Sequence, residues 1–400
     1  MEIGMTERLY YDQTYLKEFD AIVTGCTLRE DGMCELTLDR SAFYPTSGGQ
    51  PFDIGVIICG NQTYPVTDVS VTKEGEVVHL VPYGLHEGDA VHGKIDWDRR
   101  FEHMQQHGGE HMLAGAVWEK LRGMTIGLHL GKDVSTIDVT LPDERVRVTD
   151  EEIAMLEDLV NERIQHNDPV KCWFPDEDEL KALPLRKAPT VSEHVRIVAF
   201  GDYEMVACGG THPAFTGEIG CIRILSVTPA RGKARFAFVC GMRAVRLNRL
   251  TADIAGQAGT LLSVPAEGIV NAITAMKEKM SELTNEMKDL QIKQITGLLK
   301  EHTEELKDGT KLSSVWLENG NPDAMLAAVQ KTVRNEKTIV VAGASRRLVY
   351  ARSPELNIDM AALIRQTGKG GGRSEFASGS GEETSIAAAV ALLRSKETAE

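Results

Sequence analysis

Two pairs of metal-binding side chains stand out in the sequence. His107 and His111 are four residues apart in a segment predicted to be helical, so both imidazoles would project from one face about one turn apart. Cys208 and His212 form a second pair, separated by three small residues that are typical of a turn. Three nitrogens and one sulfur make a tetrahedral ligand set suited to Zn²⁺. The sequence therefore predicts one zinc site with these four ligands.

The first pair invites comparison with the H-E-x-x-H motif of zinc proteases, in which the general-base Glu directly follows the first His. Gly108 occupies that position here, and Glu110 precedes His111 instead, so a protease is disfavoured. Glu110 remains a candidate catalytic carboxylate. Gly108 and Gly109 would each cost on the order of 1 kcal/mol relative to Ala inside a helix. Either a substrate approaches the helix closely at these glycines, or the helix begins after them.

A loop over residues 43–51 carries hydroxyl groups, a glycine pair and one amide between two prolines. Such a loop can present hydrogen-bonding groups to a small polar substrate. Thr46 and Gln50 are its candidate substrate-contacting residues. The alternative is an ordinary turn in which Gln50 bonds only the loop backbone.

The charges are distributed unevenly along the chain. The 400 residues carry a formal net charge of −15, which on average argues against nucleic-acid binding. Residues 219–252, however, contain no acidic side chain and seven Arg or Lys. This basic strip includes Arg231, Lys233, Arg235 and Arg243. It is suited to RNA phosphates, although charges that protect an edge strand would look the same.

Several general features bear on where the protein works. The seven cysteines are odd in number and scattered, which favours reduced thiols over a disulfide framework. The first twelve residues show no export signal, and no apolar run approaches the roughly 20 residues of a membrane span. We therefore expect a cytoplasmic protein without a membrane partner.

The hydrophobic pattern predicts an α+β multidomain fold. Residues 1–95 contain six short strands, typical of a small antiparallel β-barrel. Residues 96–250 mix helices and strands in an α+β domain that carries both ligand pairs. Residues 251–312 show heptad spacing, which predicts a helical hairpin or coiled-coil arm that packs on its own domain or forms a homodimer contact. In residues 313–400 strands alternate with helices, as in a compact α/β domain.

Three motifs in this order resemble the editing domain of alanyl-tRNA synthetases, which the free-standing AlaX proteins share. They are the S-G-G-Q loop ending at Gln50, the H-x-x-x-H pair, and C-x-G-T-H followed by T-G-E-I-G at residues 216–220. A glycine-rich run at residues 368–373 looks like the hallmark of the DHHA1 domain that closes those synthetases. The resemblance covers nearly the whole chain and points to the long AlaX form.

The resemblance implies an aminoacyl-tRNA deacylase that hydrolyses the ester of seryl- or glycyl-tRNA-Ala. It implies Zn²⁺ as cofactor, a substrate contact for Gln50, and tRNA contacts for Lys369 and Arg373 in the DHHA1-like domain beside those of the basic strip. Whether zinc polarises the ester carbonyl, activates water or only orients substrate stays open. Gly108 departs from the family, which usually has Thr there. No class II synthetase core precedes the editing region, so we do not expect amino-acid activation.

The sequence disfavours two other functions. A phosphoesterase carrying a DHHA1 domain would need an Asp-His-His motif, and the sequence contains none. A non-catalytic RNA-binding protein would keep the basic strip but lose metal ligands, whereas all four predicted ligands are present. The deacylase is therefore the favoured function.

Overall fold

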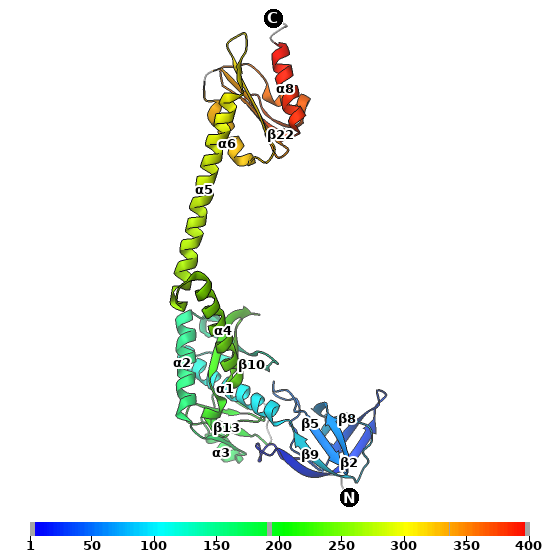
Figure 1. Ribbon diagram of the computed structural model, residues 1–400. Coiled ribbons are helices and arrows are strands. Elements are labelled where there is room, and N and C mark those ends of the chain that lie inside the picture. The colour runs from blue at the N-terminus through cyan, green and yellow to red at the C-terminus, as the bar shows by residue number, and fades with distance from the viewer. Residues whose placement is uncertain (1–4, 190–193, 336, 397–400) are drawn as a thin grey trace. The chain divides into compact units, whose positions relative to one another are not determined.

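The structure is a computed structural model that describes residues 5–189, 194–335 and 337–396. It contains two compact units, Met1–Ile254 and Ala255–Glu400, whose elements are labelled in Figure 1. Both units combine helices with sheets, so the mixed α/β multidomain character predicted from the sequence is confirmed. None of the helices in these described ranges has the length and apolarity needed to cross a membrane.

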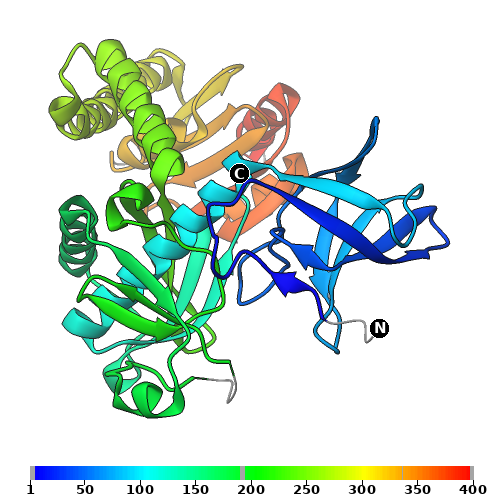
Figure 2. The same cartoon turned by 90° about the horizontal axis from the view of Figure 1, so that it is seen from below.

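Seven strands near the N-terminus form one antiparallel sheet in the order β6-β5-β9-β2-β3-β8-β7. Their bounds are β2 (Glu18–Leu28), β3 (Met33–Leu38), β5 (Gly55–Cys59), β6 (Gln62–Val66), β7 (Asp68–Val71), β8 (Val77–Pro82) and β9 (Ala90–Ile95). The sheet has one strand more than the six predicted, because the chain breaks at Thr67, so that β6 pairs with β5 and β7 with β8. Because β6 and β7 adjoin in the chain yet end the sheet on opposite sides, the sheet curls into a nearly closed barrel (Figure 2).

Two helices pack on a four-stranded antiparallel sheet in the rest of the first unit. The elements are α1 (Trp97–Leu121), α2 (Asp150–His166), β10 (Met124–Leu130), β11 (Ser135–Thr140), β15 (Ile222–Ala230) and β16 (Lys233–Cys240). Their apolar faces share one core that includes Leu113, Val160 and Phe236. Thr149 caps the start of α2 with a capping box of two hydrogen bonds. The Thr149 hydroxyl accepts one from the Glu152 N–H, and the Glu152 carboxylate accepts the other from the Thr149 N–H. This core packs against α1, the helix that carries the first of the two predicted ligand pairs.

Smaller elements complete the first unit. They are β1 (Glu7–Arg8), β4 (Arg40–Ser41), β12 (Val170–Trp173), β13 (Ile197–Phe200), β14 (Glu204–Ala207), α3 (Glu177–Ala182), and the 3₁₀ turns η1 (Pro142–Glu144) and η2 (Thr216–Ile219). The strands β12, β13 and β14 form an antiparallel sheet, and β1 pairs parallel to β4. The chain leaves β14 directly into the turn that carries Cys208.

The second unit is a three-layer α/β structure. Its sheet has the order β17-β18-β19-β20-β22-β21, and only β18 and β19 pair in parallel. The elements are β17 (Thr303–Glu305), β18 (Lys311–Leu317), β19 (Thr338–Ala344), β20 (Arg347–Arg352), β21 (Lys369–Arg373), β22 (Phe376–Ser380), α5 (Ile269–Glu301), α6 (Pro322–Thr332), α7 (Met360–Thr367) and α8 (Glu383–Lys396). Alternate residues of β19 face different cores, with Val340 towards α5 and α6 and Val341 towards α7 and α8.

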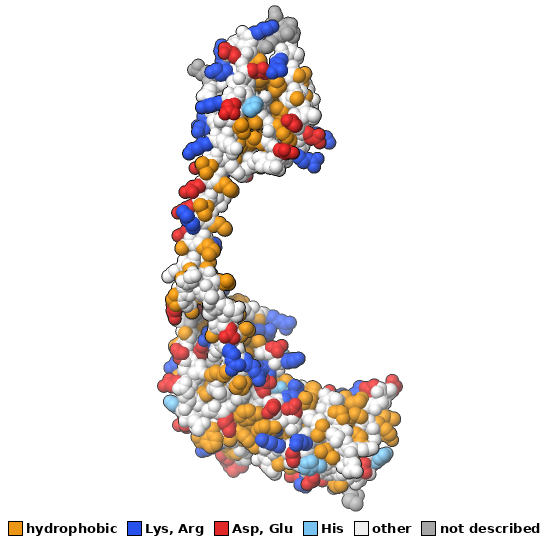
Figure 3. All heavy atoms as spheres, viewed as in Figure 1, with side chains coloured by type: hydrophobic (Ala, Val, Ile, Leu, Met, Phe, Trp, Pro, Cys, Tyr) orange, Lys and Arg blue, Asp and Glu red, His pale blue; other side chains and the backbone are white. Residues whose placement is uncertain are grey.

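The region predicted to be an arm consists of long helices. α4 (Gly241–Leu262) runs through the predicted boundary at residue 250, and a short 3₁₀ turn, η3 (Ala266–Gly268), precedes α5. Only the end of α5 is buried, at Ile295 and Leu299. The heptad positions from Ile273 to Leu290 are 45–66% exposed, and Figure 3 shows hydrophobic side chains among charged ones along this helix. No other part of the described chain therefore covers these apolar heptad positions.

The prediction of reduced cysteines is wrong for one pair. Cys26 on β2 and Cys34 on β3 form a disulfide with a Cα–Cα distance of 6.0 Å. The register of these neighbouring strands places Cys26 opposite Leu36, two residues from Cys34, and so brings the thiols together. The other five cysteines, Cys208 among them, are free.

Candidate metal centre

The first ligand pair lies on α1. Asp96 caps this helix by accepting a 3.1 Å hydrogen bond from the Arg99 N–H. The helix continues through Gly108 and Gly109, so it does not begin after them. A Cβ at Gly109 would lie 2.1 Å from Cys240 Sγ, and one at Gly108 would lie 3.1 Å from Ile219 Cγ1. The glycines therefore make room for the protein's own side chains, which corrects the expectation of a substrate approach at this point.

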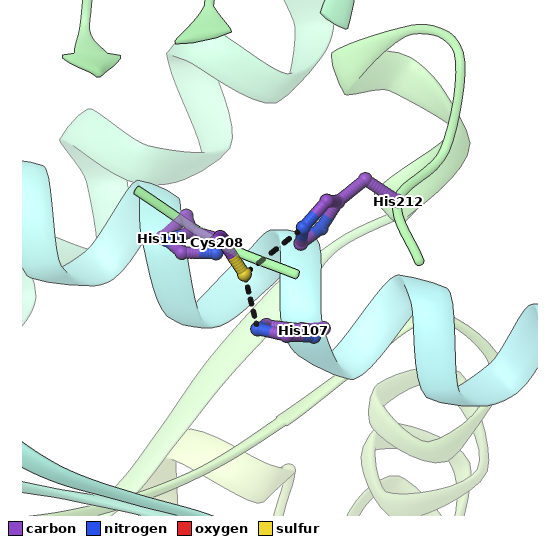
Figure 4. Close-up of side chains that lie close together, drawn as sticks. All are labelled: His107, His111, Cys208 and His212. Atoms are coloured by element: carbon purple, nitrogen blue, oxygen red, sulfur yellow. Dashed lines mark hydrogen bonds between the residues drawn. The ribbon is translucent and has the colours of Figure 1, made fainter. Parts of the chain in front are cut away.

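The four predicted ligands converge (Figure 4). One donor atom from each of His107, His111, Cys208 and His212 lies within 4.8 Å of all the others. Cys208 Sγ is 3.4 Å from His107 Nε2 and 3.3 Å from His212 Nε2. Bond lengths of about 2.1 Å to nitrogen and 2.3 Å to sulfur around tetrahedral zinc require an N···S separation of roughly 3.6 Å. The N₃S donor set and its spacing therefore fit a zinc ion.

The electrostatics of the cluster also favour a bound cation. Burial lowers the pKa of His107 to about 3, and it lowers the pKa values of His111 and His212 well below the ordinary range. The imidazoles are therefore neutral, as metal ligands must be. Burial raises the pKa of the Cys208 thiol to about 12. A dication among these groups would stabilise the thiolate, because its positive charge would offset the cost of burying a negative one.

Two of the histidines are oriented by neighbouring side chains. His107 Nδ1 lies 2.8 Å from Gln50 Oε1, and His111 Nδ1 lies 3.3 Å from Glu110 Oε2. Such contacts fix the ring orientation and leave Nε2 free for a metal. His111 Nε2 is buried and has no hydrogen-bond partner among the described residues. Burial, followed by the charge of Glu204, raises the pKa of Glu110 to about 8.

Gln50 is fully engaged inside the protein. Its Oε1 also accepts a 3.2 Å hydrogen bond from the Thr211 N–H, and its Nε2 donates a 2.8 Å bond to Thr211 Oγ1. The Gln50 side chain therefore bonds His107 and Thr211, and not the backbone of its own loop, which was one alternative from the sequence. Its polar atoms do not face the open cavity. It connects His107 on α1 to the turn that carries Cys208 and His212.

The loop that carries Gln50 is fastened to α1 by a buried ion pair. Arg100 and Asp53 are both inaccessible to solvent, and Arg100 Nε lies 2.9 Å from Asp53 Oδ2. The same carboxylate oxygen accepts a 2.7 Å hydrogen bond from the Tyr44 N–H. Gly48 and Gly49, with φ of 57° and 87°, then turn the chain back towards Gln50.

A cavity of about 660 Å³ opens onto the cluster, a size typical of small-ligand sites. Its wall includes three of the ligands, His107, His111 and Cys208, together with Glu110. The 43–51 loop contributes Tyr44, Ser47 and Gly48. Thr46 is exposed and does not line the cavity, so the structure does not bring it to the cluster.

Two cavity-lining residues were missed by the sequence analysis. Thr125 on β10 is buried, and its Oγ1 has no hydrogen-bond partner among the described residues. The β10–β11 register shifts between Thr125 and Gly127, an irregularity that re-aims side chains and is common beside active sites. Arg196 donates to the carbonyls of Cys208 and Gly210 at 3.1 and 2.8 Å, and thus holds the ligand turn. No local sequence signal marks either residue.

The predicted RNA-binding residues lie at several places. Arg231 lies in the turn of the β15–β16 hairpin, and Lys233 begins β16. Arg235 pairs with Asp138 at 2.7 Å and Arg243 with Glu102 at 2.9 Å, so both already serve the fold. Lys369 and Arg373, in the second unit, are exposed at the two ends of the edge strand β21.

Known protein families match two parts of the first unit, and one of the matches includes Cys208 and His212. Residues 6–99 match the class II (A) tRNA synthetases, and residues 195–235 match the threonyl and alanyl tRNA synthetase second additional domain. The chain is 32% identical over 390 residues to an alanine–tRNA ligase of Pyrococcus furiosus. The alignment covers 94% of this chain but only 42% of that enzyme. A solved structure of the exonuclease RecJ bound to manganese aligns with 34% of this chain and 37% of RecJ at 15% identity, with a TM-score of 0.27, too low to support an argument.

The most informative relative is the alanyl-tRNA editing protein AlaX-L of Pyrococcus horikoshii. It is 32% identical to this chain over 398 residues, and the alignment covers 94% of both proteins. The chain therefore belongs to the AlaX-L family of alanyl-tRNA editing proteins.

Proposed function

We propose that this protein is a zinc-dependent deacylase that hydrolyses the ester of seryl- or glycyl-tRNA-Ala. The observation that carries the proposal is the convergence of His107, His111, Cys208 and His212 at the wall of a 660 Å³ cavity. A metal-binding set beside a cavity of this size suits hydrolysis of a small aminoacyl group. The AlaX-L family, whose Pyrococcus horikoshii member is an alanyl-tRNA editing protein, supplies the substrate class, mischarged tRNA-Ala.

A bound zinc ion would supply Lewis-acid polarisation of the ester carbonyl or activation of a water molecule, and a role limited to orienting the substrate is the third possibility. The chain's own residues prepare the site. Gln50 holds the proton on His107 Nδ1 by accepting its hydrogen bond, so that the lone pair of Nε2 faces Cys208. Glu110, on the cavity wall, places its Oε2 3.3 Å from His111 Nδ1. Arg196 fixes the carbonyls of the ligand turn.

Contacts with the body of the tRNA are assigned to basic residues of both units. Arg231 and Lys233 sit at the end of a hairpin, and Lys369 and Arg373 lie on an exposed glycine-rich edge strand. Arg235 and Arg243 would have to exchange an intramolecular carboxylate for a phosphate, so their contribution should be smaller.

The domain assignment forms part of the proposal. Residues 1–95 form the barrel, 96–250 the editing domain, 251–312 the helical arm, and 313–400 a DHHA1-like domain that binds tRNA. The exposed apolar positions of α5 make a homodimer contact reasonable. A role in tRNA editing implies a cytoplasmic location, where charged tRNA is used.

A deacylation assay tests the function directly. Purified protein should hydrolyse seryl- and glycyl-tRNA-Ala and spare alanyl-tRNA-Ala, with seryl-tRNA-Ser as a control for tRNA identity. Cys208→Ala and His107→Ala should lose bound zinc and activity together, whereas Cys172→Ala, which alters an exposed free cysteine, should lose neither. Full activity in a metal-free preparation would contradict a catalytic zinc ion.

A further inference from the structure

We propose that the outer part of this cavity is a subsite for the terminal nucleotide of the aminoacylated RNA, with its base stacked on Phe174 and its phosphate beside Arg8 and Lys187. The inference rests on the proposed function, because it assumes that the aminoacyl ester lies at the metal ligands. The evidence for it comes from the charge, the apolar surface and the connectivity of the cavity wall.

The cavity is positively charged in an otherwise acidic protein. Four cationic side chains line it, Arg8, Arg186, Lys187 and Arg196, whereas Glu110 is the only carboxylate among the lining residues that the structure describes. Arg186 is neutralised by Glu204 at 2.8 Å, and Arg196 is occupied by backbone carbonyls. In the described part of the chain, neither Arg8 nor Lys187 forms an ion pair with a carboxylate. Lys187 is therefore the cation most available to an anionic ligand. Arg8 donates to the Gly75 carbonyl at 2.9 Å and to Tyr11 Oη at 3.2 Å, but no carboxylate of a described residue neutralises its charge. A phosphate is the anion that a nucleotide carries.

The same wall exposes apolar surface that a base could cover. Phe174 follows β12 and is 44% exposed, and Ile126 on β10 is 41% exposed. Tyr11 contacts Phe174 edge to face, with ring centroids 5.8 Å apart. This contact supports the Phe174 ring from one side and leaves no space for a base between the two rings. Stacking must therefore use the exposed part of Phe174.

The aromatic pair is connected directly to the metal ligands. A Cβ on Gly209, which follows Cys208, would lie 3.7 Å from Tyr11 Oη. Arg8 in turn donates a 3.2 Å hydrogen bond to Tyr11 Oη. The ligand turn, Tyr11, Phe174 and Arg8 thus form one continuous surface. An ester at the cluster would place the attached nucleoside along this surface.

Isothermal titration of the full-length protein with a non-hydrolysable probe tests the subsite. The probe is 3′-deoxy-3′-(L-seryl)aminoadenosine 5′-monophosphate, in which an amide replaces the ester. Phe174→Ala should weaken binding about 10-fold, in the range of base stacking on aromatic side chains. Phe174→Trp should keep the affinity, because it keeps an aromatic face. Lys187→Gln should weaken binding of the probe but leave binding of the same nucleoside without its phosphate unchanged.

Phe215→Ala is the matched control, since Phe215 is also 44% exposed but does not line the cavity. The proposal is overturned if Phe174→Ala binds like the wild type, or if Phe215→Ala weakens binding equally. Adenosine 5′-monophosphate alone should bind more weakly than the probe, and equal affinities would overturn the assignment to an aminoacylated end.

The subsite and the proposed function can fail separately. If the probe binds with this pattern but seryl-tRNA-Ala is not hydrolysed, the subsite stands and the function fails. If hydrolysis occurs and its KM is unaffected by Phe174→Ala, the subsite alone is overturned.

Discussion

Gln50 and His107 are joined by a 2.8 Å hydrogen bond between Oε1 and Nδ1, although they are 57 residues apart in the chain. The same amide holds Thr211, which lies between Cys208 and His212. One buried side chain therefore sets the orientation of a ligand on α1 and the position of the turn that carries the other half-site. We therefore expect Gln50 to affect metal binding more directly than the choice of substrate.

Gln50→Ala should weaken zinc binding by roughly 10- to 100-fold, the usual cost of removing a group that orients a ligand. The His107 ring would lose its acceptor, and the Thr211 hydroxyl would lose its donor. Competition with a chelator of known affinity measures the change. Gln13→Ala, at an exposed glutamine, should retain wild-type affinity. Unchanged zinc affinity in Gln50→Ala would instead favour the sequence-based prediction that Gln50 contacts the substrate.

The barrel that supports this loop should lose stability in mild acid through His79. His79 is buried, its Nε2 accepts from the Ser41 hydroxyl at 2.7 Å, and burial lowers its pKa to about 4. Below the ordinary pKa of 6.5, the unfolded chain binds a proton that the folded barrel excludes. This contribution is constant above about pH 6.5 and falls by up to about 1.4 kcal/mol per pH unit between pH 6.5 and pH 4.

Hydrogen exchange of the β3 and β8 backbone amides measures this loss, since these strands pair beside His79. The pH dependence should be flatter in His79→Gln, which has no group that titrates in this range. His86→Gln removes an exposed imidazole and should change nothing. An equal slope in the wild type and His79→Gln would show that other groups cause the acid sensitivity.

Truncation after about residue 260 should leave the metal centre folded and active on short substrates. Every ligand and every cavity-lining residue belongs to the unit that ends at Ile254. Loss of the basic edge of β21 should weaken binding of tRNA-Ala by at least about 10-fold at physiological salt, because phosphate contacts are lost. A filter-binding titration measures the affinity, and light scattering shows whether the exposed face of α5 holds a dimer. Unchanged affinity would argue against a tRNA-binding role for the second unit.

Most of the elements and the four residues of the candidate metal centre could be picked out from the sequence because their signals are local. Short apolar and alternating runs indicate most of the barrel strands, and Thr149 followed three residues later by Glu152 is a local signal for the start of α2. The i, i+4 spacing of His107 and His111 survives folding unchanged because a helix preserves it. The Cys208 to His212 pair is likewise a property of one short turn.

The rest of the site depends on contacts between distant segments, which no single stretch of sequence encodes. The break at Thr67 arises because the strand must pair with β5 on one side and β8 on the other. Gly109 is required by Cys240, 131 positions further along. Arg196 has its role because it donates to the carbonyls of Cys208 and Gly210, and these contacts form only in the folded chain.

Thr125 should distinguish serine from alanine, substrates that differ by one hydroxyl. A buried site that hydrogen-bonds a hydroxyl disfavours the analogue that lacks it, because its own polar group is then left unpaired. Thr125 fits this requirement, because the residue lines the cavity and its buried Oγ1 has no hydrogen-bond partner among the described residues. Thr125→Val keeps the shape and removes the hydroxyl, so the ratio of seryl- to alanyl-tRNA-Ala hydrolysis should fall about 10-fold with zinc content intact. Thr46→Val, at an exposed position outside the cavity, is the matched control and should keep the wild-type ratio. The opposite pattern, with only Thr46→Val losing discrimination, would return the role to the 43–51 loop and would require that loop to close over the cavity when substrate binds.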